Sequence, residues 1–158
     1  MKTVAILFLA IFLAVSAFVG GPACKVIIDY SSLLRSATEL NRLTQFKNAQ
    51  LAAKSMALRE AAYGGWIAAR AVLDEPYGAH SEANTKAILD EAYAVCDWAK
   101  TVRAWCDVVR SAKDGPIPAA TVAKWSAQMD AWMAQDEKLI RNIAESDLPK
   151  GYVPPKTR

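Results

Sequence analysis

Residues 88–109 carry apolar side chains at alternating steps of four and three, and this spacing constrains the fold more than any other feature of the chain. It places seven residues on one face of an α-helix: Ile88, Ala92, Val95, Ala99, Val102, Cys106 and Val109. A second apolar face, interrupted by Asp136, follows over 119–146 and comprises Val122, Trp125, Met129, Trp132, Leu139 and Ile143. Because no stretch alternates with the two-residue period of a half-buried strand between hairpin turns, the pattern predicts an all-α protein.

Three helical regions are predicted, at about 28–73, 81–112 and 119–146. The first contains the Gly64-Gly65 pair, which predicts a break near its end. Its apolar positions drift around the helix, as suits packing against several neighbours. Short turns rich in glycine and proline separate the regions. Since short turns favour antiparallel neighbours, we expect an up-down antiparallel bundle of three helices, or of four if the first region is split in two.

Residues 1–23 have the features of a segment that directs export. Lys2 precedes a run of 16 residues from Val4 to Val19 that is apolar at every position except Ser16, and small or weakly apolar residues follow up to Ala23. A signal peptide usually has an apolar core of about 7 to 15 residues, whereas a spanning helix needs about 20. The run lies between these lengths. Two alternatives therefore remain, a cleaved signal peptide and a retained N-terminal membrane anchor, and both export the rest of the chain.

Cys24 is a candidate for lipidation. A bacterial lipoprotein signal ends immediately before a cysteine that receives a diacylglycerol, and Cys24 has this position at the start of the predicted bundle, 24–147. Such signals usually have leucine at minus three and alanine or serine at minus two, whereas Gly21 and Pro22 occupy these positions. We expect the exported part to lie in the periplasm or cell envelope, to associate with the membrane through its N-terminus, and to end in an extended, proline-containing tail, 148–158.

The charge of the chain is small overall and unevenly distributed. A formal net charge of +3 does not indicate a nucleic-acid partner. Residues 25–70 hold seven basic and three acidic side chains, whereas residues 74–147 hold thirteen acidic and eight basic ones. We expect the basic first region to pack against the acidic later helices. A basic face close to a membrane would also attract anionic headgroups.

Four tryptophans form two pairs with a spacing of seven residues, Trp98 with Trp105 and Trp125 with Trp132. Seven residues are two helical turns to within about 20°, so each pair lies on one helix face and all four rings could meet between antiparallel helices. One interpretation places the rings in the core. The other makes them an interaction surface for a partner, glycan or ligand, since large aromatic side chains dominate interface energetics.

No pattern in the sequence indicates catalysis or cofactor binding. The motifs GxSxG and HExxH and a glycine-rich phosphate loop do not occur in it, and His80 is its only histidine. Cys96 and Cys106 lie about 15 Å apart along one predicted helix, too far for a disulfide and without the spacing of a zinc site. The sequence therefore predicts no catalytic residue, no metal and no cofactor.

Charged side chains of the two later helices are predicted to lie at the surface. Arg103 with Asp107 and Glu137 with Arg141 have the i, i+4 spacing of exposed ion pairs, which contribute little to stability. Asp136 falls on the otherwise apolar face of its helix. We expect an exposed helix segment at this position rather than a buried acid.

Together these features favour a non-enzymatic helical protein of the cell envelope, exported and tethered to the membrane, that binds an envelope protein or a second copy of itself. An N-terminal anchor followed by exported helices is similar to the layout of inner-membrane spanins, so a phage-encoded lysis or superinfection-exclusion protein is one alternative. A further alternative is a ligand-binding bundle in which the tryptophans line a pocket.

Overall fold

The computed structural model describes residue 26 and the ranges 28–73, 82–112 and 115–146. Helices form all the regular secondary structure in these ranges, and four of them pack against one another. The predicted all-α bundle is therefore confirmed, in its four-helix form. Helices in this part of the chain are too short or too polar to cross a membrane. The predictions for residues 1–23, Cys24 and 148–158 fall outside the described residues and stay predictions.

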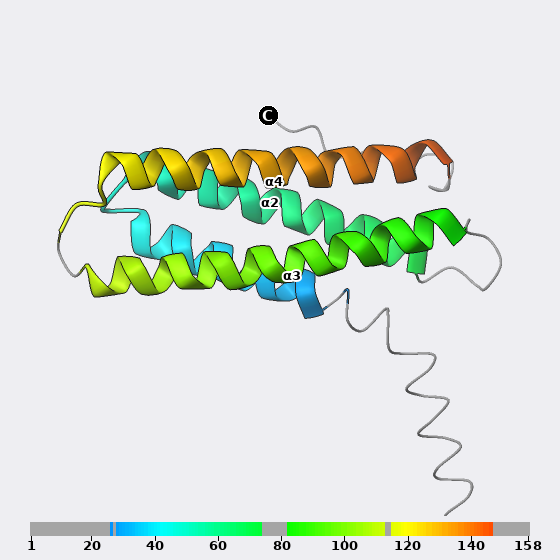
Figure 1. Ribbon diagram of the computed structural model, residues 1–158, viewed down its shortest axis with the longest axis horizontal. Coiled ribbons are helices and arrows are strands. Elements are labelled where there is room, and N and C mark those ends of the chain that lie inside the picture. The colour runs from blue at the N-terminus through cyan, green and yellow to red at the C-terminus, as the bar shows by residue number, and fades with distance from the viewer. Residues whose placement is uncertain (1–25, 27, 74–81, 113–114, 147–158) are drawn as a thin grey trace, which may run out of the picture.

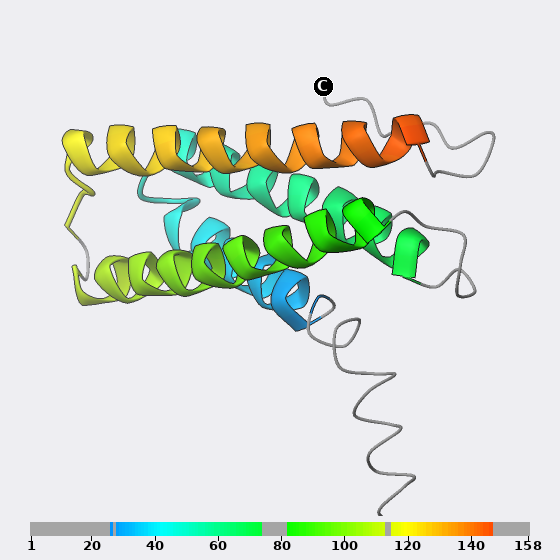
Figure 2. The ribbon, with the colours of Figure 1, turned by 45° about the vertical axis from the view of Figure 1, so that its right-hand side comes forward.

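An N-terminal helix (28–44) precedes α2 (Ala49–Leu73), α3 (Glu82–Ser111) and α4 (Ala119–Ser146). Successive helices run in opposite directions, as predicted, and α4 has its predicted bounds (Figure 1). The four helices form two hairpins. The N-terminal helix and α2 form the first, and α3 and α4 form the second. The hairpins stack so that α2 packs far more extensively against α4, with which it runs in parallel, than against α3 (Figures 1 and 2).

Polar contacts between helices fix the order of neighbours around the bundle. Asn41 Nδ2 donates to the carbonyl oxygen of Ala52 at 2.8 Å and joins the N-terminal helix to α2. Arg103 Nη2 donates to Ser32 Oγ at 3.1 Å and joins α3 to the N-terminal helix. Lys54 of α2 forms an ion pair with Asp130 of α4. A basic residue of the first region thus contacts an acidic residue of a later helix, as the distribution of charge in the sequence led us to expect.

The first predicted helix is interrupted at residues 45–48, not at Gly64-Gly65. The backbone N–H groups of Lys47 and Asn48 both donate to the carbonyl oxygen of Thr44, which closes the N-terminal helix with a turn. Asn48 Oδ1 then accepts a hydrogen bond from Leu51 N–H at 2.8 Å. This is the geometry of an asparagine N-cap, which satisfies a backbone donor in the first turn of α2. The predicted position of the break was wrong because the helix ends here without glycine or proline.

Gly64 and Gly65 lie inside α2, which continues through both residues. Alanine occupies much of this helix and favours helical backbone strongly enough to offset two glycines, each of which costs about 1 kcal/mol relative to alanine. The two glycines differ in their surroundings. A Cβ at Gly64 would have ordinary contact with Ile140, at 3.8 Å, whereas one at Gly65 would overlap neighbouring side chains.

Both predicted apolar faces are buried and form the core. All seven residues of the apolar face of α3 are buried, and so are Val122, Trp125, Met129, Trp132 and Ile143 of α4. Leu139 is half-buried against the same cluster. The N-terminal helix and α2 complete the core with Tyr30, Leu33, Leu40, Leu51 and Leu58. The periodicity of α3 and α4 therefore predicted their buried faces correctly.

Candidate functional site

The four tryptophans form one ladder of rings between α3 and α4. Successive ring centroids lie 5.5, 5.4 and 4.9 Å apart in the order Trp98, Trp132, Trp105 and Trp125. The rings alternate between the two helices, and each successive pair is stacked within 18° of parallel. The prediction that all four rings meet is confirmed.

Burial of the ladder supports its interpretation as part of the core. Trp98, Trp125 and Trp132 are buried, and Trp105 is half-buried. Each stacked pair contributes about 0.5–1.5 kcal/mol beyond the burial of its apolar area. Only the ring of Trp105 retains substantial exposure, so it is the member of the ladder most available to a partner. The interpretation of these four residues as an interaction surface stays a prediction.

Asp136, which was expected on an exposed segment, is instead buried in the centre of the bundle with 2% of its surface exposed. Its Oδ1 accepts a hydrogen bond from the Tyr30 hydroxyl at 2.9 Å. Gly65 provides the space for this contact, because a Cβ at position 65 would lie 2.5 and 2.8 Å from the two carboxyl oxygens and 2.7 Å from Tyr30 Cε1. The N-terminal helix, α2 and α4 therefore share one contact that requires glycine at position 65.

Burial changes the acidity of this cluster. It raises the pKa of Asp136 to about 7; the hydrogen bond from Tyr30 acts in the opposite direction, and the nearby charge of Glu91 adds to the increase. Burial also raises the pKa of Glu91, although Gln135 Nε2 donates to Glu91 Oε2 at 2.8 Å and partly offsets the effect. Asp136 Oδ2 has no hydrogen-bond partner among the described residues. Near neutral pH, Asp136 therefore holds its proton far more readily than an exposed aspartate does.

The buried cluster leaves no space for a substrate beside its acid. The void next to Tyr30 and Asp136, lined by residues of all four helices, is too small to hold a water molecule. A catalytic acid or base must come within hydrogen-bonding distance of the group whose proton it transfers. The geometry around Asp136 consequently favours a role in the pH dependence of folding over a role in catalysis.

A row of basic and large apolar side chains follows α2 beside the N-terminal helix. Its positions are three and four residues apart and lie within a sector of about 80° on the helix. We call this row, together with Arg35 of the N-terminal helix, the arginine–aromatic surface; its α2 members are Met56, Arg59, Tyr63, Trp66 and Arg70. The rings of Tyr63 and Trp66 are stacked with centroids 5.8 Å apart, and the guanidinium carbon of Arg70 lies 5.7 Å from the Trp66 ring centroid.

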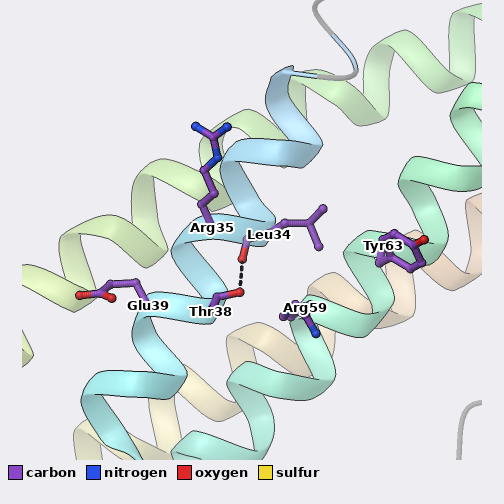
Figure 3. Close-up of a pocket in the computed structure, with 6 residues that line it drawn as sticks. All are labelled: Leu34, Arg35, Thr38, Glu39, Arg59 and Tyr63. Atoms are coloured by element: carbon purple, nitrogen blue, oxygen red, sulfur yellow. Dashed lines mark hydrogen bonds between the residues drawn. The ribbon is translucent and has the colours of Figure 1, made fainter.

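A shallow groove of about 430 Å³ between the N-terminal helix and α2 belongs to this surface (Figure 3). Its lining residues are Leu34, Arg35, Thr38, Glu39, Arg59 and Tyr63. Leu34 points toward α2, whereas Glu39 points to the other side of its own helix (Figure 3). Arg35 and Arg59 form no ion pair within the described part of the chain. Arg35 of the N-terminal helix and Arg59 of α2 therefore both line the groove with charges that no described acid neutralises, although the guanidinium group of Arg35 points away from α2 (Figure 3).

The carboxylate that lines the groove is already engaged. Glu39 Oε1 accepts hydrogen bonds from Arg42 at 2.8 Å and from Arg110 of α3 at 2.9 Å. These two hydrogen bonds lower the pKa of Glu39 to about 2. Glu39 consequently stays ionised and paired at neutral pH, and the charge that the groove offers to a ligand is that of its two unpaired arginines.

The cysteines of α3 are free and differ in their surroundings. Cys106 is buried; its thiol donates to the carbonyl oxygen of Ser36 at 3.7 Å, and burial raises its pKa to about 11. Cys96 is half-buried. Since the thiolate is the reactive form of cysteine, Cys106 has little reactivity in the folded protein. Within the described ranges, no group of three or more potential protein ligands gathers around a position suited to a metal ion.

One of the two predicted ion pairs is confirmed. Arg141 Nη2 and Glu137 Oε1 lie 2.6 Å apart on the surface of α4. The other was wrong, because Arg103 turns to Ser32 of the N-terminal helix and Asp107 instead pairs with Arg110 at 2.7 Å. Helical spacing allowed both pairs, but contacts between helices redirected the arginines of α3.

No protein-family model matches this chain, and neither does any curated protein or solved structure.

Proposed function

We propose that this chain is a non-enzymatic binding protein of the cell envelope, exported and tethered to the membrane at its N-terminus, which engages another envelope component through the arginine–aromatic surface. The observation that carries the proposal is the composition of that surface. It combines two arginines that form no ion pair with any described residue, Arg35 and Arg59, with aromatic rings that are only partly covered. The contrast with the buried acid at Asp136, which has no space for a substrate, favours binding over catalysis.

The exposed aromatic side chains support a binding role. Tyr63 is 52% exposed and stacks on Trp66, so the two rings form one apolar area rather than isolated surface residues. Tyrosine, tryptophan and arginine are enriched in the centres of protein interfaces. Single exposed apolar residues need no explanation, but a row of them interspersed with cations along one helix is a common property of interaction sites.

The alternatives from the sequence are less well supported by the described residues. A lysis protein of spanin-like layout would need to extend away from its anchor, whereas the turn at 45–48 folds α2 back along the N-terminal helix. In the tryptophan-lined alternative, a ligand would have to separate rings that are already stacked on one another at 4.9–5.5 Å. A neighbouring endolysin or holin gene would favour the lysis protein over our proposal.

Site-specific photocrosslinking in intact cells tests the proposed surface. Benzoylphenylalanine in place of Tyr63 should crosslink the full chain to an envelope component. The same group in place of Tyr93, which is similarly exposed on α3, is the matched control and should give no such product. Equal products from the two positions, or no product from position 63, would contradict the proposed binding surface.

The mode of attachment is tested by the intact mass of the protein recovered from membranes. A mass for residues 24–158 with acyl chains identifies a lipoprotein through Cys24, and the mass of all 158 residues identifies a retained anchor. Either result agrees with a tethered envelope protein. Recovery of the full-length chain from the cytosolic fraction alone would contradict export.

A further inference from the structure

We infer that the arginine–aromatic surface binds the headgroups of acidic phospholipids, so that the N-terminal helix and α2 lie against the membrane to which the chain is tethered. This inference rests on the proposed function and adds the chemistry of the partner. It uses three observations on the described residues, namely the distribution of charge, the pairing of the arginines and the position of the aromatic rings, together with the tether predicted from the sequence.

Charge separates the two hairpins of the bundle. The N-terminal helix, the following turn and α2 carry six basic and three acidic side chains over 28–73, whereas 82–112 and 115–146 carry nine acidic and seven basic ones. The hairpin that contains the arginine–aromatic surface is therefore the basic side of the molecule. An anionic bilayer attracts this hairpin and not the other, and the attraction orients the bundle before contact.

The arginines of the surface are suited to phosphate. Arg35 and Arg59 are exposed, come from two different helices and flank one groove. A guanidinium group presents a planar pair of donors that matches two phosphate oxygens. The acid that lines the groove, Glu39, already accepts hydrogen bonds from two other arginines, so it does not neutralise this pair. Glu60 of α2 is exposed beside the row, and it makes the local excess of positive charge modest.

The aromatic rings are suited to the boundary between headgroups and acyl chains. Tyrosine and tryptophan collect at this depth because their rings are apolar and carry one polar group. Tyr63 is the exposed ring next to Arg59 along α2, whereas Trp66 is half-buried against the core with its Nε1 atom buried and supports the Tyr63 ring by stacking on it. Met56 adds a flexible apolar side chain that is 37% exposed. Arginine side chains can lay their methylene groups over such an apolar area while the charged ends stay in the polar layer.

The predicted tether places this surface close to a membrane. Position 65 of α2 lies against Tyr30, so Trp66 and Arg70 are at the end of the hairpin where the N-terminal helix begins. Only four residues, 24–27, separate the predicted leader, 1–23, from residue 28, and the five steps of chain from residue 23 to residue 28 span at most about 18 Å. A surface that starts at this end of the hairpin meets the bilayer at high effective concentration, so that even a modest excess of positive charge suffices for docking. A second copy of the chain is a poorer occupant, since two such faces would bring arginines against arginines.

Hydroxyl-radical footprinting of the full chain in lipid nanodiscs tests the inference. The rate of Tyr63 modification is compared between discs of phosphatidylcholine alone and discs that also contain phosphatidylglycerol. Tyr93, which is 60% exposed on α3, is the reference within the same molecule. We expect protection of Tyr63, but not of Tyr93, in the anionic discs. Protection should be lost in 1 M salt, where the Debye length falls to about 3 Å.

Charge variants identify the residues responsible. Each basic side chain near an anionic membrane strengthens binding about fivefold, so the double variant Arg35→Gln/Arg59→Gln should weaken docking about 25-fold and restore Tyr63 reactivity. The matched control is Lys124→Gln/Lys138→Gln, which removes two exposed charges from α4 and should leave the protection unchanged. All four side chains are exposed, so the fold should survive, and circular dichroism checks this.

Two results would overturn the inference. One is a Tyr63 reactivity that is the same in neutral and anionic discs, and the other is protection that survives the double arginine variant. If Tyr63 crosslinks to a protein in cells but is not protected by anionic discs, the lipid inference fails and the proposed envelope-binding function stands. If Tyr63 is neither crosslinked nor protected, both fail.

Discussion

Replacing Asp136 with asparagine should change how the stability of this protein depends on pH. The asparagine keeps the size of the side chain and an oxygen that can accept the hydrogen bond from Tyr30, but it cannot ionise. It therefore resembles the protonated form of Asp136. The variant isolates the cost of ionising a carboxyl group that is 2% exposed in the centre of the bundle.

The direction and size of the effect follow from the pKa of Asp136, which is about 7 in the folded protein and has an ordinary value of 3.8. Below about pH 4 the carboxyl is protonated in both states, and its contribution to stability is fully present. As pH rises toward 7 the unfolded chain releases its proton first, so stability is lost. At about 1.4 kcal/mol per pKa unit the loss totals about 4 kcal/mol, of which about 2.5 kcal/mol falls between pH 5 and pH 8.

Urea unfolding of the wild type and the Asp136→Asn variant, followed by tryptophan fluorescence from pH 5 to pH 8, measures this contribution. Between pH 5 and pH 8, the free energy of unfolding of the variant should rise by about 2.5 kcal/mol relative to that of the wild type. Ionisations common to both proteins cancel in this difference. Glu91 is the other carboxyl that faces Asp136, and it is present in both. Parallel stability profiles would refute the reasoning. Tyr30→Phe is a second check: its missing hydrogen bond should raise the pKa of Asp136 further, so the loss of stability should extend to higher pH.

Three further outcomes are expected. Gly65→Ala should destabilise the protein by about 1–3 kcal/mol through overlap with the buried carboxyl group. Gly64→Ala, whose Cβ would make only an ordinary contact with Ile140, should stabilise it by up to about 1 kcal/mol in denaturant titrations. Equal effects would contradict the role of position 65. Trp132→Ala removes a ring stacked on two others and should cost about 3–5 kcal/mol by the same measurement. Brief alkylation at pH 8 followed by peptide mapping should show that Cys96 is modified before Cys106, because the Cys106 thiol is buried and has a pKa of about 11. Faster modification of Cys106 would argue against the burial of the apolar face of α3 in solution.

Regular spacing made α3 and α4 predictable. Steps of four and three place a continuous apolar face on each helix, and such a face is buried wherever the neighbours lie. The same arithmetic predicted the tryptophan ladder, because a seven-residue spacing keeps the rings on one side of each helix. It could not specify that α2 packs on α4 rather than on α3, since alanines distributed around α2 leave several of its sides suitable for close packing.

Features that depend on distant residues were not predicted. Burial, which no local pattern indicates, raises the pKa of Asp136, and a hydrogen bond from Tyr30, 106 residues away, partly offsets this increase. Gly65 was interpreted as a helix break because its role, making space for the side chains of two other helices, is not visible in its own segment. A local signal for the break at residues 45–48 is Asn48, a favourable N-cap residue from which no prediction was drawn.

The arginine–aromatic surface was missed for a related reason. Its members are spaced regularly along α2, but regular spacing of arginine with aromatic residues suits a core-facing edge as well as an open surface. Which side of α2 is covered depends on the positions of α4 and the N-terminal helix. In the sequence, Tyr63 and Trp66 on either side of the glycine pair were only a weak extension of the tryptophan interaction surface; the bundle separates them from the four tryptophans and leaves Tyr63 exposed and Trp66 half-buried.

The tryptophan ladder also gives this protein an optical signature of its own. Four indole rings in successive contact at 4.9–5.5 Å are close enough for their electronic transitions to couple, and the rings belong alternately to α3 and α4. The coupling exists only while the two helices keep their relative position along the bundle. Separation of α3 from α4, or a slip of one along the other, would therefore change the ultraviolet circular dichroism of the unlabelled protein, even in a membrane where other reporters are difficult to introduce.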